Sequence, residues 1–215
     1  MSKKPTIHLK HLEENIETTN ALLAIHEMVT GTNAGRRQEA ITVLNKSAII
    51  LLVACWEVFV EELADKAVTS LSNKMRSHTN LPKNLKKQIA ESLKGDKNEL
   101  SIWDLAGDGW KAVLKNLARR SIKNLNTPSA TNIDELFLNT IGLPILSKSW
   151  SWKRVIPAKA RKKLDSMIKL RGDITHKMKS AKSVQKGIVE SYIKFVNQLA
   201  RCSHRRIEQY MERLQ

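Results

Sequence analysis

The apolar stretch from Ala48 to Trp56, AIILLVACW, decides the fold of this chain. It is apolar on every face of a helix for more than two turns before Glu57 ends it. A helix without a polar face has to be covered by other elements, so we predict that a long helix from about Arg37 to His78 is the central, buried element. Nine apolar residues are too few to cross a bilayer, and we therefore expect no association with a membrane.

Helical periodicity continues on both sides of this stretch, and strand patterns are nearly absent. Only eight glycines and five prolines occur, and they lie mostly between the periodic segments. We therefore predict an all-α protein with a single domain over residues 1–215. Its core helices are expected at about 7–30, 37–78, 157–178 and 183–213, and a less regular insertion of short helices at about 81–152, with helices at 82–94, 102–123 and 132–140.

Several classes of protein are made improbable by what the sequence lacks. Two cysteines do not make a disulfide framework, and the polar N-terminus does not resemble a secretion signal, so we expect a cytoplasmic protein. The sequence contains no phosphate-binding glycine loop, no Cys/His zinc spacing and no nucleophile elbow. We therefore predict neither a metal nor a cofactor.

The positive charge is concentrated in one part of the chain. The formal net charge is +16, and residues 148–186 hold 13 basic and only two acidic side chains. Such a local excess favours binding of a polyanion, although a solvated helix face is the simpler alternative. The candidate residues for this binding are Lys153, Arg154, Lys159, Arg161, Lys162, Lys163, Lys169 and Lys177.

The segment Arg171 to His176, RGDITH, is the candidate site for chemistry. Arg171 and His176 are five positions apart, about 140° around an ideal helix. An arginine binds a phosphate through two hydrogen bonds, and a histidine transfers a proton near neutral pH, so the pair suits phosphodiester cleavage. The spacing alone also arises by chance in basic helices. Gly172 is costly inside a helix and predicts a kink or the close approach of another backbone.

Three segments in order resemble the HEPN superfamily of helical ribonucleases, and specifically its RiboL-PSP-HEPN branch. The Arg171 to His176 segment is similar to the Arg-x4-6-His signature of the superfamily. The segment 54–63, ACWEVFVEEL, resembles the Trp-Glu-x-aromatic-x-Glu helix of the branch, and the segment 126–137, NTPSATNIDELF, resembles its central loop. A Trp150-Ser151-Trp152 element precedes the basic helix, as it does in the branch.

The resemblance implies an up-and-down bundle that forms a homodimer, with the Arg171 and His176 of both subunits in one basic cleft. It implies RNA cleavage without a metal, often in toxins or phage-defence effectors, with an antitoxin or other regulatory protein as a further partner. Arg171 would hold the scissile phosphate, His176 would transfer the proton, and Glu57 or Glu61 would orient them.

Gly172 departs from the family pattern, in which the position after the arginine is often Asn or Asp. Either Asp173 substitutes for that polar group or the site is weakened. The alternative function is accordingly a non-catalytic module of the same fold that binds RNA or a protein.

Overall fold

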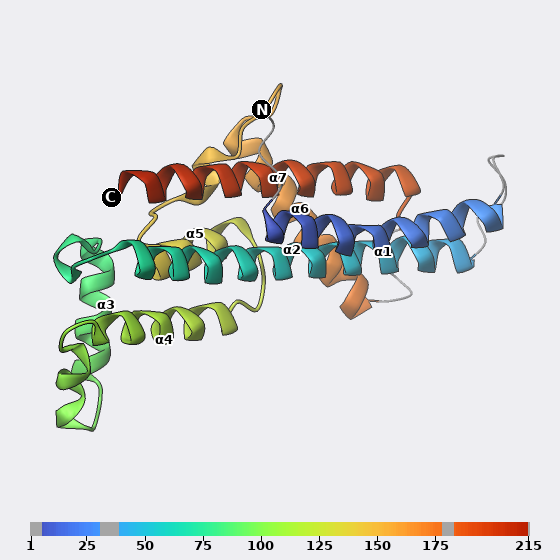
Figure 1. Cartoon of the computed structure of the whole chain (residues 1–215). Coiled ribbons are helices and arrows are strands. Elements are labelled where there is room, and N and C mark those ends of the chain that lie inside the picture. The colour runs from blue at the N-terminus through green and yellow to red at the C-terminus, as the bar shows by residue number, and fades with distance from the viewer. Residues whose placement is uncertain (1–5, 31–38, 178–182, 215) are drawn as a thin grey trace. The chain divides into compact units, whose positions relative to one another are not determined.

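The computed structural model describes residues 6–30, 39–177 and 183–214. Every regular element within these ranges is a helix (Figure 1), and the only β-type pairing there is an isolated bridge between Trp152 and Val155. The predicted all-α fold is therefore confirmed. Its α-helices are α1 (Ile7–Thr30), α2 (Glu39–Lys74), α3 (Lys83–Lys94), α4 (Gly109–Lys123), α5 (Ala130–Ile141), α6 (Pro157–Lys177) and α7 (Lys186–Arg213). Three short 3-10 helices lie between them, η1 (His78–Asn80), η2 (Glu99–Leu105) and η3 (Leu146–Ser149).

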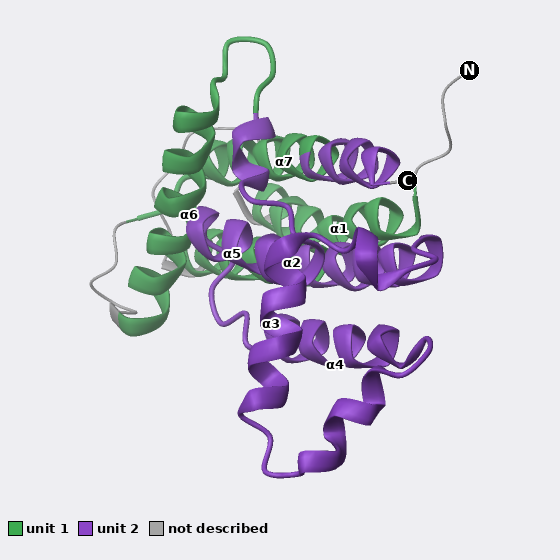
Figure 2. Cartoon of the chain, turned by 90° about the vertical axis from the view of Figure 1, so that its left-hand side faces the viewer, with its two compact units in different colours: residues 1–59, 151–202 green, residues 60–150, 203–215 purple. Residues whose placement is uncertain are grey.

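The chain divides into two compact units (Figure 2). Unit 1 comprises Met1–Phe59 and Ser151–Cys202, and unit 2 comprises Val60–Trp150 and Ser203–Gln215. The boundaries fall inside α2 and α7, so each of these two long helices contributes residues to both units. The insertion predicted at 81–152 lies in unit 2 except for its last two residues.

The core of unit 1 brings together four helices that are far apart in the sequence. A cluster of buried apolar residues draws members from α1, α2, α6, α7 and the segment just before α7: Leu23, Ala48, Ile49, Ile174, Val184 and Val189. The amide Nδ2 of Asn45 donates a 2.9 Å hydrogen bond to the carbonyl of Val184, which is a buried polar link in the same region. The central position predicted for the AIILLVACW stretch follows from this packing, since Ile49, Leu52 and Trp56 are fully buried.

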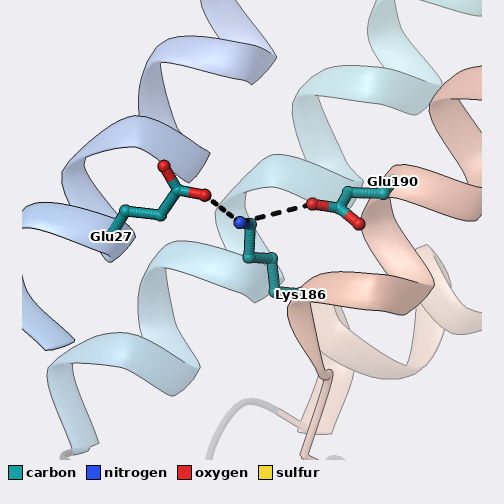
Figure 3. A network of polar contacts seen from close by, with 3 residues as sticks. All are labelled: Glu27, Lys186 and Glu190. Atoms are coloured by element: carbon teal, nitrogen blue, oxygen red, sulfur yellow. Dashed lines mark hydrogen bonds and ion pairs between the residues drawn. The ribbon is translucent and has the colours of Figure 1, made fainter. Parts of the chain in front are cut away.

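A second, exposed link in unit 1 joins α1 to the start of α7 (Figure 3). The ammonium of Lys186 donates to the carboxylate of Glu27 and lies 3.3 Å from Oε1 of Glu190. All three side chains are partly or largely exposed, so we expect water and salt to weaken these contacts.

Unit 2 is organised around α5, which contacts α3, α4 and η3. The carboxylate of Asp134 on α5 accepts hydrogen bonds from the backbone N–H and the hydroxyl of Ser147, at 2.7 and 2.6 Å. The indole N–H of Trp150 donates to the hydroxyl of Ser203 at 2.8 Å, and both residues are buried. One buried neutral hydrogen bond and two part-buried bonds to a carboxylate therefore help to fix this unit.

The structure corrects two of the predicted helix bounds. The central helix, predicted over 37–78, ends at Lys74, and His78 belongs to η1, while residues 37 and 38 lie outside the described residues. The helix predicted over 102–123 is divided into η2 and α4, because Gly107 between them has a φ of +57°. That left-handed conformation interrupts a right-handed helix.

The expectation of no membrane association rests on the nine-residue AIILLVACW stretch, but the apolar part of the helix that contains it is longer. One described helix segment, Ile41–Lys74 in α2, is long and apolar enough by length and composition to cross a membrane, with a hydropathy of 1.9. Isolated polar residues on either side of the AIILLVACW stretch do not lower the mean hydropathy enough to exclude it. Half of the 18-residue segment to which this hydropathy applies is buried within the protein. Core helices of soluble proteins can be equally long and apolar.

Candidate functional site

The candidate site lies in the C-terminal half of α6, which is held by one apolar stripe. Ala160, Leu164 and Met167 are fully buried, and Ile174 is 5% exposed. Their spacing of four, three and seven residues places them on one side of the helix, so basic residues occupy the other sides. Because Ile174 belongs to the core cluster of unit 1, the turn that carries Arg171 and His176 has a fixed position in that unit.

The structure places Arg171 and His176 on successive turns with different exposure. Arg171 borders the apolar stripe and is half-buried, whereas His176 is exposed. Thr175 lies between them around the helix and donates its hydroxyl to the carbonyls of Arg171 and Gly172, at 3.1 and 3.0 Å. The backbone that joins the two candidate residues is therefore tied by a side chain that the sequence argument did not single out.

Gly172 is neither a break in the helix nor a point of close backbone approach, contrary to the sequence-based expectation. The helical assignment of α6 continues through it, and a Cβ atom added there would meet nothing within 4 Å. Residues four apart are neighbours on a helix surface, so Gly172 lies beside His176. The missing side chain leaves a stretch of bare backbone next to the exposed imidazole.

The three candidate carboxylates have different relations to this motif. Asp173 is half-buried and three residues before His176, so the two side chains are neighbours on the helix. Glu57 is half-buried on the part of α2 that belongs to unit 1. Glu61 belongs to unit 2, and burial raises the pKa of its carboxyl group. Among the described residues, no carboxylate lies within ion-pair distance of the Arg171 guanidinium.

The predicted RNA-binding residues separate into exposed and half-buried groups. Lys153, Arg154, Lys159, Lys162 and Lys169 are exposed, and Arg161 and Lys163 are half-buried. Lys162, Lys169 and His176 are seven residues apart, which places them in one row along α6. The side chain of Lys177 lies outside the described residues.

Lys163 is already engaged within unit 1. Its ammonium lies 5.5 Å from the ring centroid of Tyr192 and 5.0 Å from that of Phe195, and it donates to the hydroxyl of Ser191 at 2.9 Å. Burial lowers the pKa of the Lys163 ammonium. The aromatic partners were missed from the sequence, and the signal available was their position in the core-facing stripe of the last helix.

No metal ligand set accompanies the motif in the described ranges, where no group of three His, Cys, Asp or Glu side chains is placed to hold an ion. The functional groups that the structure offers at this site are thus the guanidinium of the half-buried Arg171, the imidazole of the exposed His176 and the neighbouring carboxylate of Asp173.

Comparison with known proteins gives one positive result. Neither the curated proteins nor the solved structures include a significant match to this chain. The family model of RiboL-PSP-HEPN, however, matches residues 10–209, which include all three resembling segments and every candidate site residue. The HEPN superfamily is commonly nuclease-related, which points to an RNA-related function. The chain therefore belongs to the RiboL-PSP-HEPN family.

Proposed function

We propose that this protein is a metal-independent endoribonuclease that uses Arg171 and His176. The observation that carries the proposal is the position of Arg171, a half-buried residue at the edge of the apolar stripe whose guanidinium has no carboxylate at ion-pair distance in the described part of the chain. A cation in that position gains most when an anion binds to it. The exposed imidazole of His176 lies on the next turn, and the bare backbone at Gly172 gives a phosphate access between them.

The chemistry follows from these two groups. Arg171 donates two hydrogen bonds to the scissile phosphate and stabilises the negative charge that develops on it. His176 transfers a proton, and the 2′-hydroxyl of the RNA is the nearest nucleophile. As the 2′-oxygen bonds to phosphorus, the bond between phosphorus and the 5′-oxygen of the next nucleotide breaks. The products are a 2′,3′-cyclic phosphate and a free 5′-hydroxyl, and DNA is not cut.

A homodimer completes the proposed site. One subunit supplies one histidine beside Arg171, whereas concerted cleavage is served by one group that accepts a proton and one that donates it. A two-fold axis near the end of α6 would bring two copies of the motif together. The concentrated positive charge of the two copies then repels in the free protein and is neutralised by bound RNA, so binding weakens steeply with salt.

The second candidate is a non-catalytic module that binds RNA or a protein through the same basic helix. Gly172 is the observation that favours it, because the family often has Asn or Asp at that position. In this case Arg171 still binds a phosphate, and His176 has no role in chemistry.

Cleavage of a mixed RNA pool by the full chain in the presence of a chelator separates the two candidates. We expect His176→Ala to lose roughly 10²–10⁴-fold in rate with nearly normal RNA binding. Arg171→Ala should lose roughly 10²–10³-fold and also bind RNA more weakly. His78→Ala and Arg119→Ala are matched controls, because both side chains are exposed and lie in unit 2.

Each other outcome of this experiment is informative. Wild-type protein that binds RNA but leaves it intact supports the non-catalytic module. Full activity in both α6 variants overturns the assignment of the site, and activity only with added Mg²⁺ overturns the mechanism. If sedimentation at several concentrations shows a monomer that still cleaves RNA, the proposal of a cleft shared by two subunits is overturned.

A further inference from the structure

The two-residue turn before α6 carries two cations, Lys153 and Arg154, and the backbone of Arg154 is strained. Trp152 and Val155 exchange two backbone hydrogen bonds, of 3.1 and 2.8 Å, around Lys153 and Arg154. Arg154 has a φ of +67°, and no other non-glycine residue in the described ranges has a positive φ. At such a position in a two-residue turn glycine is the unstrained choice. An arginine kept there against strain indicates that its exposed side chain serves another purpose.

An aromatic cluster lies directly under this turn. The half-buried ring of Trp152 packs against Phe195 with 6.0 Å between ring centroids, and Phe195 is only 4% exposed. Lys163 bridges Phe195 and the half-buried Tyr192. We call Trp152, Tyr192 and Phe195 the aromatic cluster. The buried Phe195 fixes the orientation of Trp152, whose remaining surface faces solvent.

The charge around the aromatic cluster is entirely positive along this part of the chain. Residues 151–163 hold six basic side chains and no acidic one. Aromatic rings with an accessible face, interleaved with cations, are the combination that binds single-stranded nucleic acid, since bases stack on the rings while cations contact the phosphates. Trp152 is half-buried, so part of its ring is accessible for such stacking. A double helix keeps its bases stacked internally and cannot use such a ring.

We infer that the turn and the aromatic cluster form a binding site for single-stranded RNA, in which Trp152 stacks on an unpaired base and Arg154 contacts an adjacent phosphate. This inference rests on the proposed function and names the form of RNA that the enzyme takes. From Pro157 to His176 the axis of α6 rises about 28 Å. The exposed Lys162 and Lys169 lie along that path, so the site holds RNA at a distance from the bond that is cut.

Binding measured with the non-cleaving His176→Ala full chain tests this inference. The probes are a fluorescein-labelled single-stranded oligonucleotide and a blunt RNA duplex of the same length. Trp152→Leu keeps an apolar side chain against Phe195 but removes the stacking surface, and Trp152→Phe retains a ring. We expect Trp152→Leu to weaken single-strand binding roughly 5- to 150-fold, the effect of losing one stacked base, and to leave duplex binding unchanged.

Two controls separate stacking from general damage. Trp152→Phe should bind the single strand within a few-fold of the parent protein. Trp103→Leu removes a tryptophan that is 72% exposed in unit 2, and it should not change binding. Circular dichroism of each variant checks that the helical fold is intact.

Arg154→Gly gives a signature that a purely structural role does not produce. Glycine relieves the positive φ, so the melting temperature should rise, whereas loss of the cation should weaken RNA binding. The slope of log affinity against log salt should fall in magnitude by about 0.7 for one lost phosphate contact. In the cleaving protein, the same change should raise KM and leave kcat unchanged, because Arg154 is remote from His176.

The outcomes distinguish this inference from the proposed function. Equal weakening of single-strand and duplex binding by Trp152→Leu, or no weakening of either, overturns the stacking site and leaves the endoribonuclease proposal intact. If Trp152→Leu weakens only single-strand binding, and the wild-type protein never cleaves RNA, the stacking site is supported and the endoribonuclease proposal is overturned. A parent protein that binds neither probe overturns both.

Discussion

Gly142 in unit 2 and Gly172 in unit 1 occupy opposite kinds of surroundings. Gly142 ends α5 with a φ of +79°, and an added Cβ would lie 2.6 Å from Cβ and 2.8 Å from Cγ of Pro82. Gly172 is helical, and an added Cβ would meet nothing within 4 Å. The fold therefore requires the first glycine and does not require the second. The gap beside His176 is a property of the surface of α6, where a ligand approaches, and not of the packing beneath it.

The largest expected effect in this comparison is that of Gly142→Ala. The methyl group would force both a left-handed alanine and a clash with a proline ring, which is rigid and part of the corner where α3 begins. We expect a loss of about 2–5 kcal/mol in the free energy of unfolding, from the conformational and overpacking costs together. Urea unfolding followed by circular dichroism measures it.

Gly95→Ala is the matched control for this prediction. Gly95 also ends a helix in unit 2, but its φ is −86° and an added Cβ would have only ordinary contacts at 3.6 and 3.9 Å. A stability change within about 0.5 kcal/mol is expected there. If the two alanine variants lose the same stability, the distinction between a required and a replaceable glycine fails.

Gly172→Ala should have the opposite sign. Alanine is about 1 kcal/mol more favourable than glycine inside a helix, and the open space leaves no clash to offset that gain. For a chain of this size the melting temperature should rise by about 2–4 °C. A melting temperature that falls would show that another part of the protein, or a second copy, approaches the helix at this point.

Much of the fold was predictable because its signals are local. The AIILLVACW stretch has no polar face, which predicts the burial seen at Ile49, Leu52 and Trp56, although Ala54 is exposed, and the resembling segments identify the family. The division of the helix predicted over 102–123 was missed, because a glycine within a helical pattern does not reveal its φ. In the structure Gly107 is left-handed and Gly109 has the carbonyl of Asp104 in the place of a Cβ.

The candidate site was predictable only as far as the spacing of Arg171 and His176. The hydrogen bonds of Thr175 depend on the helical backbone and were accessible in principle. The engagement of Lys163 was not, since Tyr192 and Phe195 are about thirty residues later and reach it only through the packing of α7 on α6. In sequence Lys163 is simply one of three consecutive basic residues.

The two ends of α7 extend the comparison from glycines to polar contacts. At its start, in unit 1, Lys186 pairs with Glu27 and Glu190 in an exposed network (Figure 3). Near its end, in unit 2, the hydroxyl of Tyr210 donates a 3.2 Å hydrogen bond to the carbonyl of Ile141. The first link depends on charge and the second does not, so acid and salt should act on them differently.

The smallest expected effect is therefore an acid-sensitive loosening at the start of α7. The hydrogen bond from Lys186 and its charge lower the pKa of the Glu27 carboxyl below its ordinary 4.5. A lowered pKa means that the ion pair stabilises the fold above pH 4.5 and that this contribution is lost as the pH falls through the folded-state value. Because Glu27 is exposed, the change should be small and should shrink further in high salt. Hydrogen exchange of the first turns of α7, corrected for the slower intrinsic exchange of amides in acid, should show weaker protection at pH 3.5 than at pH 6 for the wild type and no such difference for Glu27→Gln. Tyr210→Phe is the contrasting variant: it removes an uncharged hydrogen bond and should loosen the end of α7 equally at both pH values. Acid sensitivity that persists unchanged in Glu27→Gln would show that another carboxylate governs this end of the helix.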